Sequence, residues 1–233
     1  MFRGPYLLRP KWSVTPTCPA KTFPLSTPGL PASVRLIYCI EPLAAAIALV
    51  LLSPLIVTLA IITAILSRRS PLIVHNRVGW RGAHLAMLKF RTMWTDDESP
   101  GELVLIEDVS GCVPVAKDDA DPRVTSRFAA FCRRSSLDEL PQLYHVMRGE
   151  MSLVGPRPIT LAELETHYGD SAAEVVSLRP GLTGLWQVNG RNELTYEERK
   201  ELDLRLVREV SLALYFGILL RSVPRVVSGS GAC

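Results

Sequence analysis

Acidic residues are almost absent from the first 95 positions of this 233-residue chain, where Glu41 is the only one. The same stretch holds 11 of the 26 lysines and arginines, so its net charge is +10, and the remainder of the chain carries −7. A basic segment beside an apolar run is typical of a protein at an anionic membrane surface, and we expect that surface rather than nucleic acid as the partner. The composition, 48% hydrophobic and 21% charged, excludes an intrinsically disordered chain.

The chain also lacks the spacings that mark common cofactor and metal sites. Its five cysteines are scattered, without a C-x-x-C pair, which argues against a disulfide framework or a zinc site and indicates a reducing compartment. The sequence contains no G-x-x-x-x-G-K-[ST], no G-x-G-x-x-G and no H-E-x-x-H. The four histidines are dispersed, and we interpret each as a surface or packing residue: His75, His84, His145 and His167.

Charge is missing altogether from Pro42–Ser67, a run long enough to cross a bilayer core of about 30 Å. A single crossing helix is one interpretation. Ser53-Pro54 in its middle predicts a bend, because the proline removes the donor that would bond the Val50 carbonyl, and the serine hydroxyl is one candidate replacement. Basic residues flank both ends, and the positive-inside bias then places both ends in the cytoplasm. We therefore expect a re-entrant helix over residues 34–69.

The remaining sequence predicts an unequal division of the chain. Residues 1–33, with seven prolines and no acid, predict an arm without a fold of its own. Residues 70–233 form the cytoplasmic domain, and the whole is α+β: the re-entrant membrane helix plus a small, mostly helical domain with short strands and interfacial amphipathic helices. We expect these elements in the domain: two strands around a Gly79–Gly82 turn, a loop over 95–120, and helices from Asp138 to Gly149, within 160–178 and over 193–222.

An acidic pair, Asp138-Glu139, stands at the start of one predicted helix, because Pro141 fits a helix only in its first turn. The positive end of the helix dipole and the unpaired backbone donors there keep an aspartate ionised and attract phosphate. A purely structural interpretation stays open. Asp138 is then a helix cap, or Ser136 and Glu139 form a capping box.

Basic residues in turn-like contexts accompany the acidic pair. Bases on rigid turns suit a phosphorylated ligand, because a preorganised guanidinium loses little entropy on binding. With the acidic pair they indicate phosphoryl-transfer chemistry, in which positioning and charge neutralisation dominate. The residues concerned are Lys89, Arg91, Arg123, Arg157 between two prolines, and Arg191, with an arginine cluster upstream of the pair at Arg127, Arg133 and Arg134.

Five blocks make the sequence resemble the monotopic phosphoglycosyl transferases, also called the bacterial sugar transferase family. The likeness runs from about Arg35 to the C-terminus. Arg35 and Glu41 are the only counterparts of the basic pair and the aspartate usual at the start of the family's membrane helix. The blocks are KFRTM (89–93), DPRVT (121–125), SLDELPQL (136–143), GEMSLVGPRP (149–158) and RPGLTGLWQVNGR (179–191).

The resemblance implies transfer of a sugar-1-phosphate from a UDP-sugar to polyprenyl (undecaprenyl) phosphate, with release of UMP, at the cytoplasmic face of the bacterial inner membrane. Asp138 matches the nucleophile, which forms a covalent phosphosugar-enzyme in a ping-pong scheme. Glu139 matches the ligand of a magnesium ion. The product lipid would initiate exopolysaccharide, capsule, O-antigen or glycoprotein glycan assembly.

The same resemblance assigns substrate-binding residues. It leaves open the sugar, the pathway and whether the protein forms a homo-oligomer. The alternative function is a membrane-anchored scaffold or binding protein in which the acidic pair only caps a helix, while a nucleic-acid binder is at odds with the apolar run. The expected phosphate ligands are Lys89, Arg91, Arg123, Arg133 and Arg157 with its neighbours Pro156 and Pro158, and the expected peripheral residues are Gln187, Arg191 and Asp203.

Overall fold

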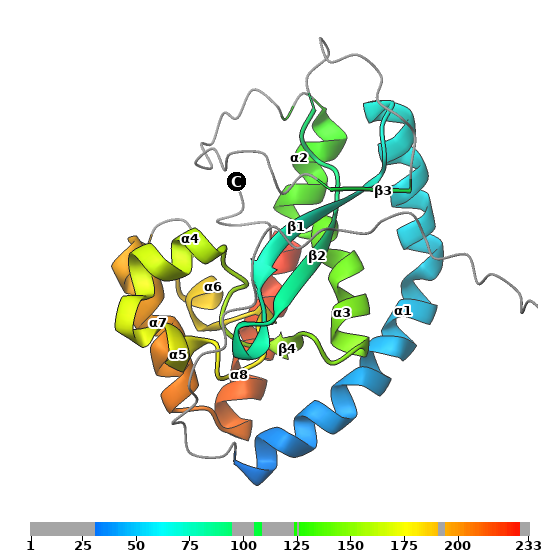
Figure 1. The fold of residues 1–233 in the computed structure, drawn as a ribbon. Helices are drawn as coiled ribbons and strands as arrows, with labels where there is room; N and C mark the ends of the chain where they lie inside the picture. Colours follow the sequence, from blue (N-terminus) through cyan, green and yellow to red (C-terminus); the bar gives the residue numbers. More distant parts are fainter. Residues whose placement is uncertain (1–30, 95–104, 109–123, 125, 191–193, 229–233) are drawn as a thin grey trace, which may run out of the picture.

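A computed structural model describes residues 31–94, 105–108, 124, 126–190 and 194–228 (Figure 1). The predicted arm lies outside these residues except at its C-terminal end, where the first long helix already begins at Ala32. Most of the predicted 95–120 loop also lies outside them. Within that stretch the loop prediction is wrong at Ile106–Asp108, which form strand β3.

Helix α1 (Ala32–Ser67) is 36 residues long and curves around one side of the molecule (Figure 1). It is the one helix in the described part of the chain that is long and apolar enough to cross a membrane. The Ser53 hydroxyl donates to the Val50 carbonyl at 2.8 Å, which confirms the predicted replacement for the donor that Pro54 removes. One turn later the Thr58 hydroxyl donates to the Pro54 carbonyl, also at 2.8 Å.

Both halves of α1 pack on the same domain. In the N-terminal half, Val34, Ile37 and Tyr38 are buried in a core shared with α6 (Leu185–Asn189) and α8 (Leu212–Ser228). Farther along, Ala45 packs against α3 (Leu143–Met147), and Leu59 packs in a cluster with Phe90 and Cys132. Other apolar side chains of the helix are exposed, among them Leu43, Ile47, Val50, Leu51, Leu55, Val57, Ile61 and Ile65.

A buried carboxylate secures the N-terminal half of α1. Glu41 is 3% exposed, and its Oε1 accepts hydrogen bonds from the Ser152 hydroxyl at 2.6 Å and the Leu153 amide at 2.7 Å. The Tyr215 hydroxyl of α8 donates to the same oxygen. Because these donors come from strand β4 (Ser152–Val154) and from α8, one side chain joins α1 to two elements of the domain.

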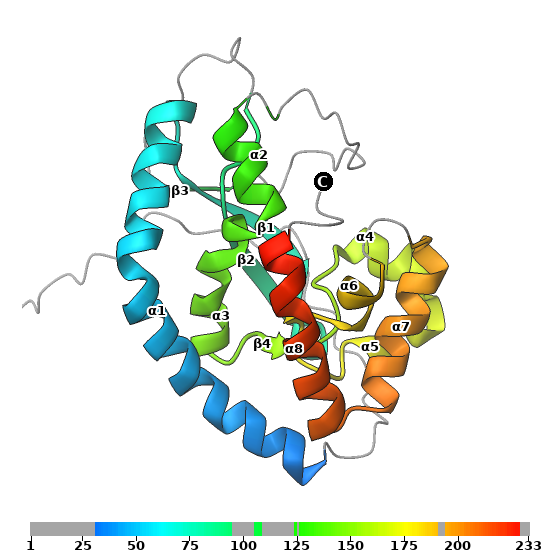
Figure 2. The ribbon, with the colours of Figure 1, turned by 180° about the vertical axis from the view of Figure 1, so that it is seen from behind.

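The predicted hairpin is confirmed. Strands β1 (Leu72–Val78) and β2 (His84–Phe90) pair antiparallel around the short helix η1 (Trp80–Gly82). β3 pairs with the other edge of β1 in parallel, so the strand order is β2-β1-β3 and β2 is an edge strand. The hairpin lies between α3 on one side and the group of helices α4 to α7 on the other (Figures 1 and 2). A second, parallel pair joins β4 to β5 (Gly181–Thr183).

The two predicted helical stretches of the C-terminal half are each interrupted. Over 160–178 the chain forms α4 (Leu161–Glu163), the short π-helix η3 (Leu164–Tyr168), the 3₁₀ helix η4 (Gly169–Ser171) and α5 (Ala172–Val175), with Gly169 at φ +47° at the break. The stretch predicted as helical over 193–222 is confirmed as helical for the most part, but it divides in two, because α7 (Tyr196–Arg208) ends before α8 begins. The Ser211 hydroxyl accepts from the Leu214 amide at 3.3 Å and so starts the new helix.

A second buried carboxylate lies within this helical group. Asp203 of α7 is 1% exposed, and its Oδ2 accepts a hydrogen bond from the Tyr168 hydroxyl at 2.9 Å. Burial raises the pKa of Asp203 to about 7, although the bond from Tyr168 and the main-chain amide and charge of Arg157 act to lower it. The predicted peripheral ligand therefore lies in the interior, between η3 and α7.

Replacement of Glu41 tests the attachment of α1. We expect Glu41→Ala to leave three donors of β4 and α8 without their acceptor, at a cost of about 2–4 kcal/mol of stability, whereas Glu41→Gln keeps an acceptor oxygen and loses less. Thermal unfolding of the full chain in detergent measures both. Replacement of the exposed Cys39, two positions away, is the control and should leave Tm unchanged.

Asp203 predicts a pH dependence of stability. Because its pKa in the fold is about 7 against an ordinary 3.8, the folded state holds a proton that the unfolded state has released between these values. The contribution of this group to stability is therefore fully present at low pH and is lost as the pH rises toward 7. Asp203→Asn should flatten the fall of Tm between pH 5 and pH 8, and Glu209→Gln, at an exposed acid beyond the end of α7, should not.

Candidate active site

The acidic pair lies on the short helix η2 (Leu137–Gln142), which runs directly into α3. η2 follows α2 (Arg127–Arg134), a helix that the sequence analysis missed. The two helices are separated by a turn in which Ser136 has the left-handed φ of +55°. Pro141 lies inside η2, in agreement with the predicted helix start. Ser136 occupies the N-cap position but its side chain caps nothing, and Asp138 lies inside the helix, so both versions of the capping interpretation are wrong.

Lys89 faces the pair from the end of β2. Its Nζ lies 2.7 Å from Glu139 Oε1 and 3.5 Å from Asp138 Oδ2. The Asp138 side chain is 12% exposed and that of Glu139 is 26% exposed. The structure thus brings three predicted residues together, with a cation beside two adjacent carboxylates whose side chains are partly exposed.

The core beneath the pair includes a residue of α1. Cys132 of α2 and Phe90, the neighbour of Lys89, pack with Leu59 of α1. Burial and, second, the charge of Asp138 raise the pKa of the Cys132 thiol to about 11, so a neutral thiol lies near the carboxylate. The C-terminal half of α1 therefore supports the floor of the candidate site.

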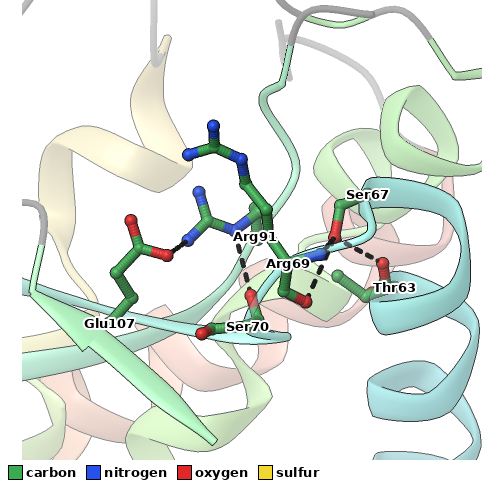
Figure 3. A network of polar contacts seen from close by, with 6 residues as sticks. All are labelled: Thr63, Ser67, Arg69, Ser70, Arg91 and Glu107. Carbon is green, nitrogen blue, oxygen red and sulfur yellow. Dashed lines mark hydrogen bonds and ion pairs between the residues drawn. The ribbon is translucent and has the colours of Figure 1, made fainter. Parts of the chain in front are cut away.

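Arg91, a predicted phosphate ligand, lies where α1 passes into the sheet (Figure 3). It is 6% exposed, its Nε donates to the Ser70 carbonyl at 2.9 Å, and its Nη2 forms an ion pair with Glu107 of β3. In the last turn of α1, the Ser67 hydroxyl donates to the Thr63 carbonyl at 2.7 Å. Through these contacts Arg91 connects the segment after α1 to β3.

Arg157 lies in a tight loop after β4. A Cβ on Gly155 would clash with the Arg179 carbonyl, and the Gly181 amide donates to the Pro156 carbonyl at 2.8 Å, so the loop is held against β5. The Arg157 guanidinium lies 5.4 Å from the centre of the Trp186 ring, and that of Arg199 lies 5.0 Å from the same ring. The guanidinium groups of Arg157 and Arg199 thus lie against the same indole ring, and two neighbouring positive charges suit the binding of an anion.

The other predicted residues are dispersed. Arg133 is half-buried in the last turn of α2, and Pro158 is buried beside Arg157. Gln187 of α6 donates to the Leu182 carbonyl at 3.4 Å. Arg123 and Arg191 lie outside the described residues. Trp186 and Arg199 were missed by the sequence analysis, because an indole under a guanidinium leaves no spacing signal.

The acidic pair fits a magnesium ion better than a protein-only metal cage. Among the described residues, no group of three or more histidine, cysteine, aspartate or glutamate side chains is arranged to hold a metal. Mg²⁺, however, is commonly bound by one or two carboxylates together with substrate phosphates and water. Glu139, the more exposed of the pair, would supply one such hard oxygen ligand.

Comparison with known proteins gives consistent relationships. The bacterial sugar transferase family matches residues 34–229. The chain is 42% identical over 195 residues to the UDP-galactose-lipid carrier transferase of Erwinia amylovora. The matched region covers 79% of this chain and 39% of that protein. It is 38% identical over 200 residues to the exopolysaccharide production protein ExoY of Rhizobium meliloti (82% and 85%).

A third relative is the undecaprenyl-phosphate galactose phosphotransferase of Salmonella typhimurium, 40% identical over 161 residues, or 68% of this chain and 33% of that protein. The chain thus spans well under half of the Erwinia and Salmonella relatives and most of the Rhizobium one. The family match covers nearly all of α1 and the domain that carries the acidic pair. The resemblance drawn from the five blocks is therefore confirmed, and this chain belongs to the bacterial sugar transferase family.

Proposed function

We propose that this chain transfers a sugar-1-phosphate from a UDP-sugar to undecaprenyl phosphate, giving undecaprenyl-diphosphate-sugar and UMP. The observation that carries the proposal is the meeting of Asp138, Glu139 and Lys89 at the end of β2. Relatives named for galactose and glucose phosphotransfer to undecaprenyl phosphate support it. The exopolysaccharide name of the Rhizobium relative supports a role at the start of such a pathway.

The proposed reaction has two displacements at one phosphorus. In the first, an Asp138 carboxylate oxygen attacks the β-phosphorus of the donor, and the bond from that phosphorus to the bridging oxygen breaks, so UMP leaves with the electron pair. In the second, a phosphate oxygen of the lipid attacks the same phosphorus, and the bond to Asp138 breaks to restore the carboxylate. Neither step needs a net proton transfer, because nucleophile and leaving group are anions throughout.

Charge compensation determines whether such an attack is feasible. A carboxylate approaching a diphosphate is repelled unless cations lower the local negative charge. Lys89 lies within ion-pair distance of both carboxylates and supplies one positive charge. A magnesium ion held by Glu139 would supply further charge neutralisation on the diphosphate. Arg157 over Trp186 is a candidate for a second phosphate contact.

We propose further that α1 is re-entrant and that the domain lies on the cytoplasmic face of the inner membrane. Both halves of α1 pack on the one domain through Tyr38 and Leu59, which a straight crossing does not allow. Basic residues flank both ends of the helix. The exposed apolar stripe of α8 supports an interfacial position for that helix. The stripe consists of Leu212, Phe216, Leu220 and Val223.

The nucleophile is tested by Asp138→Asn. We expect UMP release in the presence of undecaprenyl phosphate and Mg²⁺ to fall by about 10³-fold or more, because an amide cannot form the ester, while Tm and membrane association stay unchanged. The donor is first chosen from a panel of UDP-sugars. Asp170→Asn, at an exposed acid of η4, is the matched control. Substantial turnover of Asp138→Asn would refute the covalent scheme, and no turnover of the parent chain with any donor would favour the scaffold.

The topology is tested by single cysteines near Ala32 and near Ala83, in a background without the native cysteines. Membrane-impermeant maleimide should reach both positions from the cytoplasmic side only, because the two ends of α1 pack on one domain. Reagent added to inverted vesicles reaches the cytoplasmic face of the membrane, and reagent added to intact spheroplasts reaches the opposite face. Labelling from opposite faces would mean an ordinary crossing.

A further inference from the structure

His145 of α3 lies next to the candidate site but belongs to none of the predicted groups. It is 4% exposed, and both of its ring nitrogens form hydrogen bonds. Its Nε2 lies 3.1 Å from the main-chain nitrogen of Leu88, and its Nδ1 lies 2.7 Å from Glu150 Oε2. The sequence interpretation of His145 as a packing or surface residue accounts for the burial but for neither bond.

The bonds define one tautomer. The Leu88 amide can only donate, so Nε2 is the acceptor, and the ring proton lies on Nδ1, where it is donated to Glu150. Arg148 Nε holds the other Glu150 oxygen at 2.7 Å. Burial works against ionisation of Glu150, but the bonds from His145 and Arg148 outweigh it and lower the pKa of Glu150. The imidazole is therefore fixed between an anion and a main-chain amide.

The Leu88 amide is a significant attachment point because β2 is an edge strand. Alternate amides of an edge strand have no ladder partner and need another acceptor. His145 supplies it for Leu88, and the next residue is Lys89, whose Nζ meets the acidic pair. Adjacent residues of β2 are thus bonded to η2 and to α3, two contiguous parts of one helical segment.

We propose that His145 is a positioning residue for the transferase reaction: it holds the main chain of Leu88 to α3 and thereby sets the position of Lys89 against Asp138 and Glu139. This inference rests on the proposed function, since it assigns a role in the same site. His145 itself touches none of the reacting atoms. Its effect passes through β2, which distinguishes it from a residue that only fills the core.

The experiment compares two substitutions in the purified full chain. His145→Leu keeps an apolar filler but removes the acceptor, whereas His145→Gln keeps an oxygen where Nε2 lies. We expect His145→Leu to lower kcat by about tenfold or more with KM within about twofold, and His145→Gln to recover most of kcat. His84→Ala is the matched control, because His84 bonds Asn76 at the opposite end of β2 and should leave both constants unchanged.

A double-mutant cycle with Lys89→Met separates positioning from packing. If His145 acts through Lys89, His145→Leu should have little further effect, about twofold or less, on single-turnover UMP release by Lys89→Met. An undiminished effect in that background, or equal losses for His145→Leu and His145→Gln, would overturn the proposal. Should His145→Leu fail to fold, Glu150→Ala replaces it: a lower kcat at constant KM supports the proposal and an unchanged kcat overturns it.

The outcomes also separate this inference from the proposed function. If Asp138→Asn stays active, the covalent scheme fails whatever His145 does. If Asp138→Asn is inactive while His145→Leu keeps full kcat, the reaction stands and only the positioning role is lost.

Discussion

The contact between Lys89 and the Asp138–Glu139 pair is the interaction on which the proposed chemistry depends. Two neighbouring carboxylates repel each other and any diphosphate, and an ammonium group 2.7 Å from one and 3.5 Å from the other offsets part of that repulsion. The three side chains are largely buried, so their interactions are screened less than those of exposed charges. Because Lys89 comes from β2 and the acids from η2, the packing of the hairpin on the η2–α3 segment determines the geometry.

The same packing links the site to the long apolar helix α1. Phe90, next to Lys89, and Cys132, near Asp138, share a cluster with Leu59 in the C-terminal half of α1. The N-terminal half is held separately, by Glu41 and its donors from β4 and α8. Under the proposed re-entrant topology, a helix fixed at both halves to one domain would place the acids beside the membrane surface. Arg91, which connects the segment after α1 to β3, adds to the contacts between α1 and the domain.

Local signals in the sequence predicted much of this structure. The hairpin, the helix start shortly before Pro141 and the partner of the Val50 carbonyl at Ser53 follow from glycine, proline and hydroxyl chemistry within a few residues. The buried positions of Asp203 and Arg91, and the bond from His145 to Leu88, were not predictable, because each partner lies far away in the sequence. The division of the 193–222 stretch was missed although its signal is local, since the capping bond joins Ser211 to Leu214, three residues on.

The most direct test of the account is the mass of the enzyme after incubation with its UDP-sugar donor and Mg²⁺ in the absence of the lipid acceptor. The account predicts a stable increase equal to one sugar phosphate, located by peptide mapping on Asp138, with one equivalent of UMP released. The adduct should disappear when undecaprenyl phosphate is added. Rapid turnover with the acceptor, together with no adduct on Asp138 under trapping conditions, would contradict the account.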